Sequence, residues 1–203
     1  AFKIAEYYKL NLIEVLTGFK FIGQQIKGFE EKGRGTYEFG FEESYGCLIG
    51  THARDKDGIM AVVALCEAAA YYMDKGLTLW DQMVNMYEKY GYFKEGIYTM
   101  TLAGEDGAKR INEILDNLRK NPPTELAGYK VVKTRDYEND IVKDLATGET
   151  TTTGLPKSNV LYFDMTDDAW FCVRPSGTEP KIKFYAGIKG NSLEDADEKL
   201  AKV

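Results

Sequence analysis

Apolar residues recur at helical spacing in several stretches of the chain. A spacing of three and four positions, as at Ile4, Tyr7 and Tyr8, puts the apolar side chains of a helix on one face. The pattern predicts helices over residues 2–8, 19–29, 59–73, 79–90 and 105–120, and a last helix after Ser192. Four of these six helices fall in the first half of the chain.

Shorter runs that are rich in β-branched and aromatic residues predict strands. In the first part of the chain they cover residues 12–16 and 37–41. Residues 97–102 alternate as an extended segment, and four strands follow over 129–137, 159–165, 170–174 and 181–188. The order therefore changes along the chain, from strands alternating with helices to a helix, four strands and a helix.

This change of pattern predicts two domains, residues 1–96 and 97–203, with a boundary near Gly96. Strands that alternate with helices favour an α/β domain with a parallel or mixed sheet. The second part has an α+β layout, for which we expect a four-stranded antiparallel sheet packed on two helices.

Polar residues mark where several of these helices begin. Asp55 or Asp57 is placed to cap the helix over 59–73, because a short carboxylate accepts hydrogen bonds from the free N–H groups of a first turn. Thr78 and Asp81 have the spacing of a capping box. Ser192 begins the last helix in the same way.

The amino-acid composition argues against several classes of protein. Of 203 residues, 44% are hydrophobic and 13% aromatic, which argues against a disordered chain. The net charge of −6 disfavours a nucleic-acid partner, and no apolar run reaches the roughly 18 residues of a membrane helix. The three cysteines lie far apart, so neither a disulfide framework nor a metal site is expected. A cytoplasmic protein is the resulting prediction.

The segment 174–181, Arg-Pro-Ser-Gly-Thr-Glu-Pro-Lys, is the most informative part of the sequence. It joins two predicted strands and concentrates a guanidinium, two hydroxyls, a glycine and a lysine. Such donors suit a phosphate, since arginine binds it bidentately and glycine lets the backbone approach closely. A Pro/Gly turn with solvated charges is the alternative interpretation.

Three further segments carry polar groups that could contact a phosphosugar. In residues 41–46, Phe-Glu-Glu-Ser-Tyr-Gly, carboxylates and a hydroxyl could accept hydrogen bonds from sugar hydroxyls, or form a solvated turn. Residues 51–58 hold His52, the single histidine of the chain, as a candidate proton carrier, or serve only as a helix cap with surface charge. Lys20 lies in a turn that begins with Gly18 and contains aromatic residues. It is either an ordinary surface lysine or a lysine that contacts phosphate.

Taken together and in this order, these segments resemble the motifs of the α-D-phosphohexomutases. The matching motifs are Thr-Gly-Phe-Lys-Phe-Ile-Gly at 17–23, Phe-Glu-Glu-Ser-Tyr-Gly at 41–46, Arg-Asp-Lys-Asp at 54–57 and the segment 174–181. Within that family the phosphoglucomutases are the most similar. The motifs extend over most of the chain, from residue 17 to residue 181.

The resemblance implies a chain that corresponds to the C-terminal part of a four-domain enzyme. Residues 1–96 would be part of the third, sugar-binding α/β domain without its opening elements. Residues 97–203 would be the fourth, phosphate-binding domain, with an α+β fold similar to that of TATA-binding protein. The family's Ser-His-Asn-Pro phosphoserine loop and its DxDxDR magnesium loop are absent from this sequence.

The resemblance also implies roles for individual residues. Glu42 and Ser44 would accept hydrogen bonds from sugar hydroxyls, and Arg174, Ser176, Gly177, Thr178 and Lys181 would bind the phosphate that is not transferred. Lys20 would lie near the reacting phosphate, and His52 and Arg54 would line the cleft between sugar and phosphate. No catalytic residue is assigned beyond Lys20 and His52 as assistants, because the Gly-His end of the family's sugar motif is replaced here by Tyr45-Gly46.

The implied reaction is a phosphoglucomutase-type intramolecular phosphotransfer. It interconverts glucose 1-phosphate and glucose 6-phosphate through a phosphoserine and glucose 1,6-bisphosphate, with Mg²⁺ held by the absent second domain. The partners would be the phosphosugar and the remaining domains, and this segment alone would be inactive. Phosphopentomutase, phosphomannomutase and a non-catalytic phosphosugar-binding module remain open alternatives.

Overall fold

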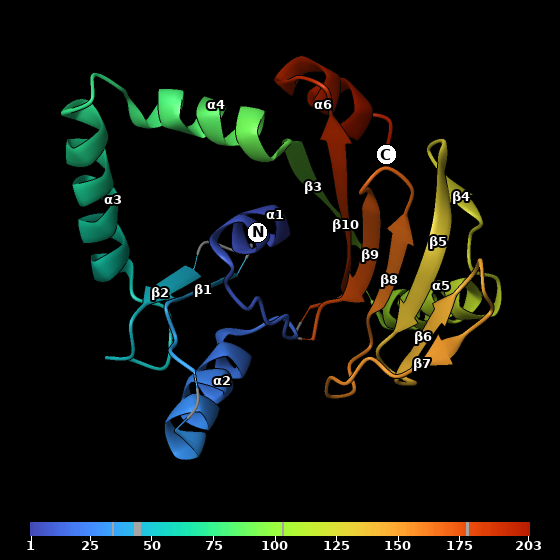
Figure 1. Cartoon of the computed structure of the whole chain (residues 1–203). Helices are drawn as coiled ribbons and strands as arrows, with labels where there is room; N and C mark the ends of the chain where they lie inside the picture. The colour runs from blue at the N-terminus through green and yellow to red at the C-terminus, as the bar shows by residue number, and fades with distance from the viewer. Residues whose placement is uncertain (34, 43–45, 103, 178) are drawn as a thin grey trace. The chain divides into compact units, whose positions relative to one another are not determined.

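The computed structural model describes residues 1–33, 35–42, 46–102, 104–177 and 179–203. The chain forms two compact units, Ala1–Tyr90 and Gly91–Val203, whose elements are labelled in Figure 1. The division falls after Tyr90, earlier in the chain than the boundary expected near Gly96. Gly96 lies within strand β3 (Tyr92–Thr101), which pairs along its whole length with the last strand of the second unit.

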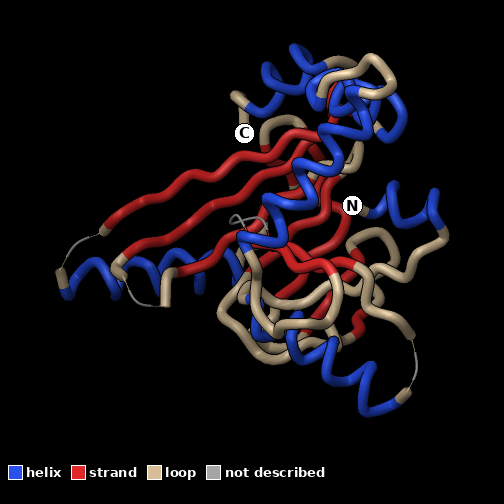
Figure 2. Tube along the Cα trace, turned by 90° about the vertical axis from the view of Figure 1, so that its left-hand side faces the viewer, coloured by secondary structure: helices blue, strands red, loops and turns tan. Residues whose placement is uncertain are grey.

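The second unit is built on one antiparallel sheet. Its strands are β3 (Tyr92–Thr101), β5 (Tyr129–Asp136), β6 (Ile141–Asp144), β7 (Thr150–Thr151), β8 (Leu161–Met165), β9 (Trp170–Pro175) and β10 (Lys181–Gly190), and β4 (Glu125–Leu126) pairs with the start of β5. They lie in the order β3-β10-β9-β8-β5-β6-β7. Figure 2 shows strands in red running side by side. The four predicted strands are confirmed as β5, β8, β9 and β10.

This sheet is wider than the four strands that we expected. β3 was expected only as an extended segment, yet it pairs with β10 from Tyr92 to Thr101. β6 folds back on β5 after Asp140, whose φ of 56° makes the turn, and β7 pairs with β6. Strands as short as β6 and β7 have too few alternating residues to stand out in the sequence.

Two helices, α5 (Glu105–Lys120) and α6 (Leu193–Leu200), pack with one face of this sheet into a core. In β8 the side chains of Leu161, Phe163 and Met165 are buried and alternate with less buried ones. Successive side chains of a strand point to opposite faces. The face away from this core therefore carries the polar residues of β9 and β10, including those of the candidate site.

The first unit contains α1 (Phe2–Tyr8), α2 (Phe19–Lys32), a hairpin of β1 (Phe39–Glu42) and β2 (Gly46–Ile49), α3 (Gly58–Met73) and α4 (Leu79–Tyr90). A small core joins α2 to the hairpin through Phe19, Ile22, Ile26 and Leu48. The hydroxyl of Tyr37 donates a hydrogen bond to the Leu48 carbonyl at 3.0 Å. All the helices predicted here are confirmed.

The mixed or parallel sheet predicted for this first unit is not found among the described residues. The hairpin of β1 and β2 is antiparallel, and the strand predicted over residues 12–16 is wrong, because that segment takes neither helix nor strand conformation. A strand needs a neighbour for its backbone N–H and C=O groups. No described strand of the chain pairs with this segment, although its sequence is apolar.

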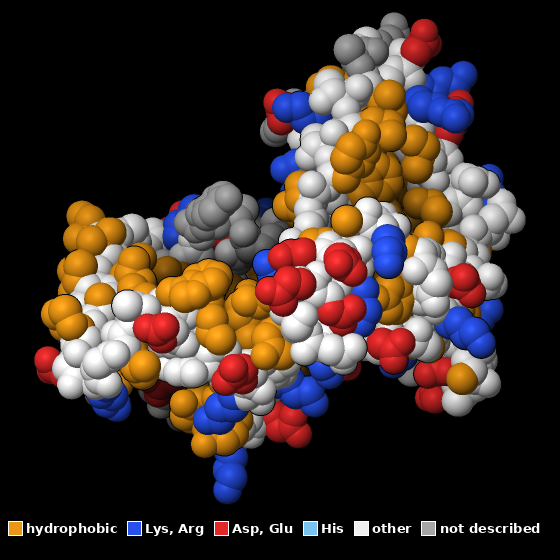
Figure 3. Space-filling view, turned by 90° about the horizontal axis from the view of Figure 1, so that it is seen from above, with side chains coloured by type: hydrophobic (Ala, Val, Ile, Leu, Met, Phe, Trp, Pro, Cys, Tyr) orange, Lys and Arg blue, Asp and Glu red, His pale blue; other side chains and the backbone are white. Residues whose placement is uncertain are grey.

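Helix α3 carries apolar side chains all round and buries none of its residues. Its most exposed apolar residues are Ile59, Val62, Val63, Leu65, Tyr71 and Met73. Hydrophobic side chains gather over this part of the molecule in Figure 3. A helix with this composition is typical of a protein interior. Of the helices that the structure describes, none has the length and apolar character needed to cross a bilayer.

The predicted helix caps are present in the structure. The Asp57 carboxylate accepts hydrogen bonds from the N–H groups of Ile59 and Met60, so Asp57 rather than Asp55 begins α3. Thr78 and Asp81 form reciprocal bonds at the start of α4. The Ser192 hydroxyl accepts from the Asp195 N–H at the start of α6. Local sequence thus determines where these helices begin.

Candidate functional site

The segment 174–181 connects β9 to β10 in the second unit. The two strands pair as far as Pro175 and Ile182, and the N–H of Ser176 donates to the carbonyl of Lys181 at 2.7 Å. The Ser176 hydroxyl accepts a hydrogen bond from the Glu179 N–H at 3.3 Å. Thr178 lies outside the described residues. The described residues of the segment therefore close a turn between two interior strands of the sheet.

Arg174 brings a charged donor to this turn. One terminal nitrogen of its guanidinium donates to the Tyr185 hydroxyl at 3.3 Å. Its Nε is buried and has no hydrogen-bond partner among the described residues. Buried donors are nearly always paired in folded proteins, so an unpaired one calls for an explanation such as a bound anion or water. This atom makes Arg174 a strong candidate for anion binding.

Gly177 and Lys181 complete the described part of this turn. A Cβ added at Gly177 would meet no atom within 4 Å, so the fold itself does not require a glycine here. The Lys181 ammonium pairs with the Glu179 carboxylate at 2.8 Å. That hydrogen bond, together with the charges of Lys181 and Lys183, lowers the pKa of Glu179. Lys181 is thus partly neutralised by a carboxylate of its own turn.

Replacing Glu179 with glutamine is expected to strengthen the binding of inorganic phosphate by about threefold. The change removes a carboxylate that repels anions and pairs with Lys181, and exposed ion pairs have modest energies. Isothermal titration calorimetry would measure the affinity at low and high salt, where screening should shrink the effect. Glu198→Gln, an exposed residue of α6, is the control with the same charge change. Unchanged or weaker binding in Glu179→Gln would contradict the expectation.

In the first unit, Glu42 ends β1 and is mostly buried, with 11% of its side chain exposed. Its carboxylate lies 3.5 Å from the Lys56 ammonium. A Cβ added at Gly46 would come within 2.5 Å of the Lys56 side chain and 3.2 Å of the Glu42 carboxylate. The absence of a side chain at Gly46 therefore leaves room for this pair. Ser44 lies outside the described residues.

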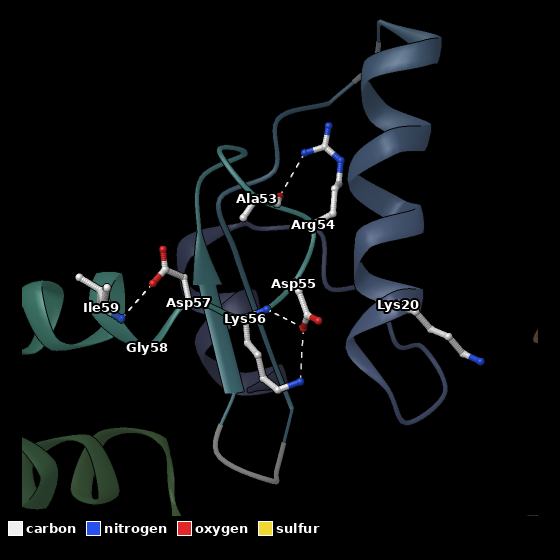
Figure 4. Close-up of a pocket in the computed structure, with 8 residues that line it drawn as sticks. All are labelled: Lys20, Ala53, Arg54, Asp55, Lys56, Asp57, Gly58 and Ile59. Atoms are coloured by element: carbon white, nitrogen blue, oxygen red, sulfur yellow. Dashed lines mark hydrogen bonds and ion pairs between the residues drawn. The ribbon is translucent and has the colours of Figure 1, made fainter.

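Lys20 and Arg54 line one open depression of about 860 Å³, together with residues 53 and 55–59 (Figure 4). Lys20 lies in the first turn of α2, and its ammonium is 4.9 Å from the centre of the Phe21 ring. Figure 4 shows the Lys20 side chain extending away from Lys56 and Arg54. The two cations expected near substrate thus share a depression but do not converge on one point.

Arg54 is held by several acceptors within its own unit. Its guanidinium donates to the carbonyls of Thr51 and Ala53 and pairs with the Glu30 carboxylate of α2. The carbonyl of Arg54 lies close to Gly23, where an added Cβ would come within 2.6 Å of it. Gly23 therefore allows the loop over residues 50–57 to pack against α2. The site depends on this close approach.

His52 contacts the cap of α3. Its Nε2 lies 2.9 Å from the Asp57 carboxylate, and about half of the His52 side chain is exposed. This hydrogen bond and the N–H groups of the first turn of α3 lower the pKa of Asp57. Asp57 therefore stays ionised down to a lower pH than a free carboxyl group does. As a carboxylate it caps α3 at every pH above its lowered pKa. His52 does not line the depression that contains Lys20 and Arg54.

Replacing Gly23 with alanine is expected to destabilise the first unit by about 1–3 kcal/mol, because the new methyl group overlaps backbone that cannot rotate away. Gly28→Ala is the matched control in the same helix, since a Cβ there meets nothing within 4 Å. That control should be stabilised by about 0.5–1 kcal/mol through helix propensity. Urea denaturation of the two variants would separate them. Equal stabilisation of both would refute the close approach.

Sequence reasoning missed two residues that the structure brings to these sites. Lys56 pairs with both Glu42 and Asp55. The hydrogen bond to Asp55 is the largest of the effects that raise the pKa of Lys56. Its place within the Arg-Asp-Lys-Asp motif was the available signal. Tyr185 contacts Arg174 from the next strand. Side chains alternate between the two faces of a strand, so Lys181, Lys183 and Tyr185 share a face. This alternation could have placed Tyr185 on the face that carries Arg174.

Two carboxylates that line the depression, Asp55 and Asp57, already have partners within the chain. Asp55 is engaged with Lys56, and Asp57 with His52 and the start of α3. Within the described parts of the chain, no three His, Cys, Asp or Glu side chains are grouped so as to hold a metal. The two sites present cations, hydroxyls and a carboxylate, which are groups suited to binding anions and sugar hydroxyls.

Comparison with known proteins gives matches along nearly the whole chain. The phosphoglucomutase/phosphomannomutase family matches twice, through its alpha/beta/alpha domain III over residues 1–90 and its C-terminal domain over residues 111–199. Phosphoglucomutases of Staphylococcus aureus strains USA300 and N315 are 38% and 36% identical over 197 residues, which is 97% of this chain. The chain spans about a third (35%) of the length of these curated relatives.

A solved structure agrees with these matches at the level of the fold. The crystal structure of the exocytosis-sensitive phosphoprotein pp63/parafusin, a phosphoglucomutase from Paramecium in its open form, superimposes with a TM-score of 0.59 at 18% identity. The superposition covers 98% of this chain and 34% of that protein. The chain therefore belongs to the phosphoglucomutase/phosphomannomutase family and corresponds to its domain III and its C-terminal domain.

Proposed function

We propose that this chain is the phosphosugar-binding part of a phosphoglucomutase. In the second unit, Arg174, Ser176, Gly177, Thr178 and Lys181 bind the substrate phosphate that is not transferred. The observation that carries this proposal is the buried Nε of Arg174, a charged donor without a partner among the described residues. It lies at a turn that also contains an exposed glycine and a serine hydroxyl. Family membership supports the same assignment.

In the first unit, Glu42 and Ser44 accept hydrogen bonds from the sugar hydroxyls. Lys20 and Arg54 contact the substrate from the depression that they line, and His52 contacts it from outside that depression. The pairing of Glu42 with Lys56 supports this role for Glu42. A carboxylate that is already held in place loses less conformational entropy when it binds a sugar hydroxyl. A bisphosphate intermediate requires each phosphate to occupy the same binding turn in succession. A set of several cations and hydroxyls can serve both orientations of the sugar.

The phosphoserine and the Mg²⁺ that offsets phosphoryl charge would belong to other domains of the whole enzyme. The residues of this chain would act by binding and orienting the substrate. We propose that the chain alone binds phosphosugars weakly and catalyses no turnover, and that the whole enzyme is cytoplasmic. Glucose 1,6-bisphosphate would be its intermediate.

The test is an assay of the longest reading frame that contains this chain. Values of kcat/KM for glucose 1-phosphate, mannose 1-phosphate and ribose 1-phosphate would be compared in the presence of Mg²⁺. The proposal expects the highest value for glucose 1-phosphate and none for the 203-residue chain alone. A higher value for mannose or ribose 1-phosphate would reassign the substrate. Binding without turnover in the long protein would instead support a non-catalytic phosphosugar-binding module.

A further inference from the structure

The register of β9 and β10 puts Arg174 and Tyr185 on the same face of the sheet. Arg174 lies directly opposite Lys183, and Tyr185 lies directly opposite Cys172. Arg174 and Tyr185 are therefore diagonal neighbours across the two strands. At this spacing long side chains reach one another.

The contact between them is a hydrogen bond from the guanidinium to the phenol. The distance from the terminal nitrogen to the Tyr185 hydroxyl is 3.3 Å, and arginine can only donate, so the hydroxyl oxygen accepts. Tyr185 is buried, with 9% of its surface exposed. A buried ring on a strand has little freedom to move. Its hydroxyl is thus a fixed point for an otherwise flexible side chain.

This fixed point matters because of what Arg174 does not contact. Its Nε is buried without a described hydrogen-bond partner, and no ion pair to a described carboxylate holds the guanidinium. By contrast, Arg135 on the same sheet is held by two hydrogen bonds to Asp164 at 2.8 and 2.6 Å. A carboxylate partner would neutralise the cation, whereas a phenol orients it and leaves its charge available to an anion.

We propose that Tyr185 is a positioning residue, which holds the Arg174 guanidinium in the direction that binds phosphate. The proposal rests on the proposed function of the segment 174–181. Tyr185 does not contact the phosphate itself. It lowers the entropy that Arg174 loses when a phosphate is bound, because one of its rotamers is already selected.

The test compares Tyr185→Phe, Arg174→Ala and the double variant of the full 203-residue chain. Inorganic phosphate and glucose 6-phosphate are titrated into each. Tyr185→Phe removes only the hydroxyl, and loss of one hydrogen bond should weaken binding about fivefold. The double variant should bind no more weakly than Arg174→Ala. Tyr162→Phe, a tyrosine of β8 that stacks on Trp170, is the control and should bind as the parent does.

A spectroscopic measurement without any ligand separates positioning from simple packing. The Nε–Hε resonance of Arg174 in a nitrogen–proton NMR spectrum should move or broaden in Tyr185→Phe and stay in place in Tyr162→Phe. The unfolding midpoint of Tyr185→Phe should change little. An unchanged Nε–Hε resonance would overturn the inference whether or not the chain binds phosphate.

The binding data distinguish failure of this inference from failure of the proposed function. Loss of binding in Arg174→Ala together with parental binding in Tyr185→Phe would overturn the role of Tyr185 alone. A further loss on adding Tyr185→Phe to Arg174→Ala would do the same, because Tyr185 would then act through another group. Parental binding in Arg174→Ala would overturn the phosphate site and this inference together.

Discussion

Replacing Arg174 with alanine is expected to weaken the binding of inorganic phosphate and glucose 6-phosphate by about 10- to 100-fold. Hydrogen bonds to charged groups are worth about 1.5–3 kcal/mol, and this range corresponds to that loss of affinity. The guanidinium is the donor best placed for this role, because it has one hydroxyl partner and a buried Nε without a described acceptor. Lys181 is already paired with Glu179.

Calorimetric titration of the parent chain and the variant measures this loss. Arg110→Ala is the control, because Arg110 is an exposed arginine of α5 that pairs only weakly along its helix with Glu113. It removes the same charge at a position outside the turn between β9 and β10. Equal losses in the two variants would mean that net charge, rather than the turn, governs binding.

Replacing Phe163 with alanine is expected to destabilise the second unit by about 3–5 kcal/mol. Phe163 lies in β8 with 1% of its surface exposed, within the core that α5 and α6 share with the sheet. Truncating a buried phenylalanine loses its transfer free energy and leaves a cavity that neighbours fill only in part. A loss of this size is a large fraction of the stability of an ordinary domain.

The fluorescence of Trp170 in β9 reports unfolding of this unit, provided that Trp80 of α4 is first replaced by phenylalanine. Trp80 is 60% exposed, so this background change should cost little. Ile97→Ala is the control, because Ile97 is 58% exposed and surface substitutions usually change stability by less than about 0.5 kcal/mol. Similar urea midpoints for Phe163→Ala and Ile97→Ala would contradict the assigned core.

The features that sequence predicted well depend on residues close together in the chain. The caps at Asp57, Thr78 and Ser192 each need only a hydroxyl or carboxylate and the N–H groups of the next turn. Helical spacing and the strong alternation of β8 are likewise local. The motif at 174–181 was recognisable because its donors are contiguous. Both the helices and the position of the turn between β9 and β10 could therefore be predicted.

The features that sequence missed depend on partners far along the chain. The segment 12–16 has the composition of a strand, but no described strand pairs with it. Pairing of β3 with β10 joins residues that a local pattern cannot connect. The contact of Tyr185 with Arg174 depends on strand register, and that of Lys56 with Glu42 on the absence of a side chain at Gly46. Such contacts follow from tertiary structure.

The most direct test of the phosphate site is an NMR titration of the 203-residue chain with glucose 6-phosphate. We expect saturable shifts of the backbone amides over residues 174–181, in a spectrum whose dispersion shows a folded chain. The shifts in this turn are compared with those at a second depression, which lies at the far end of β10. It is lined by Tyr129, Asp167 and Lys199 among others. Shifts confined to that depression, or no shifts in a folded chain, would contradict the assignment of phosphate binding to the turn between β9 and β10.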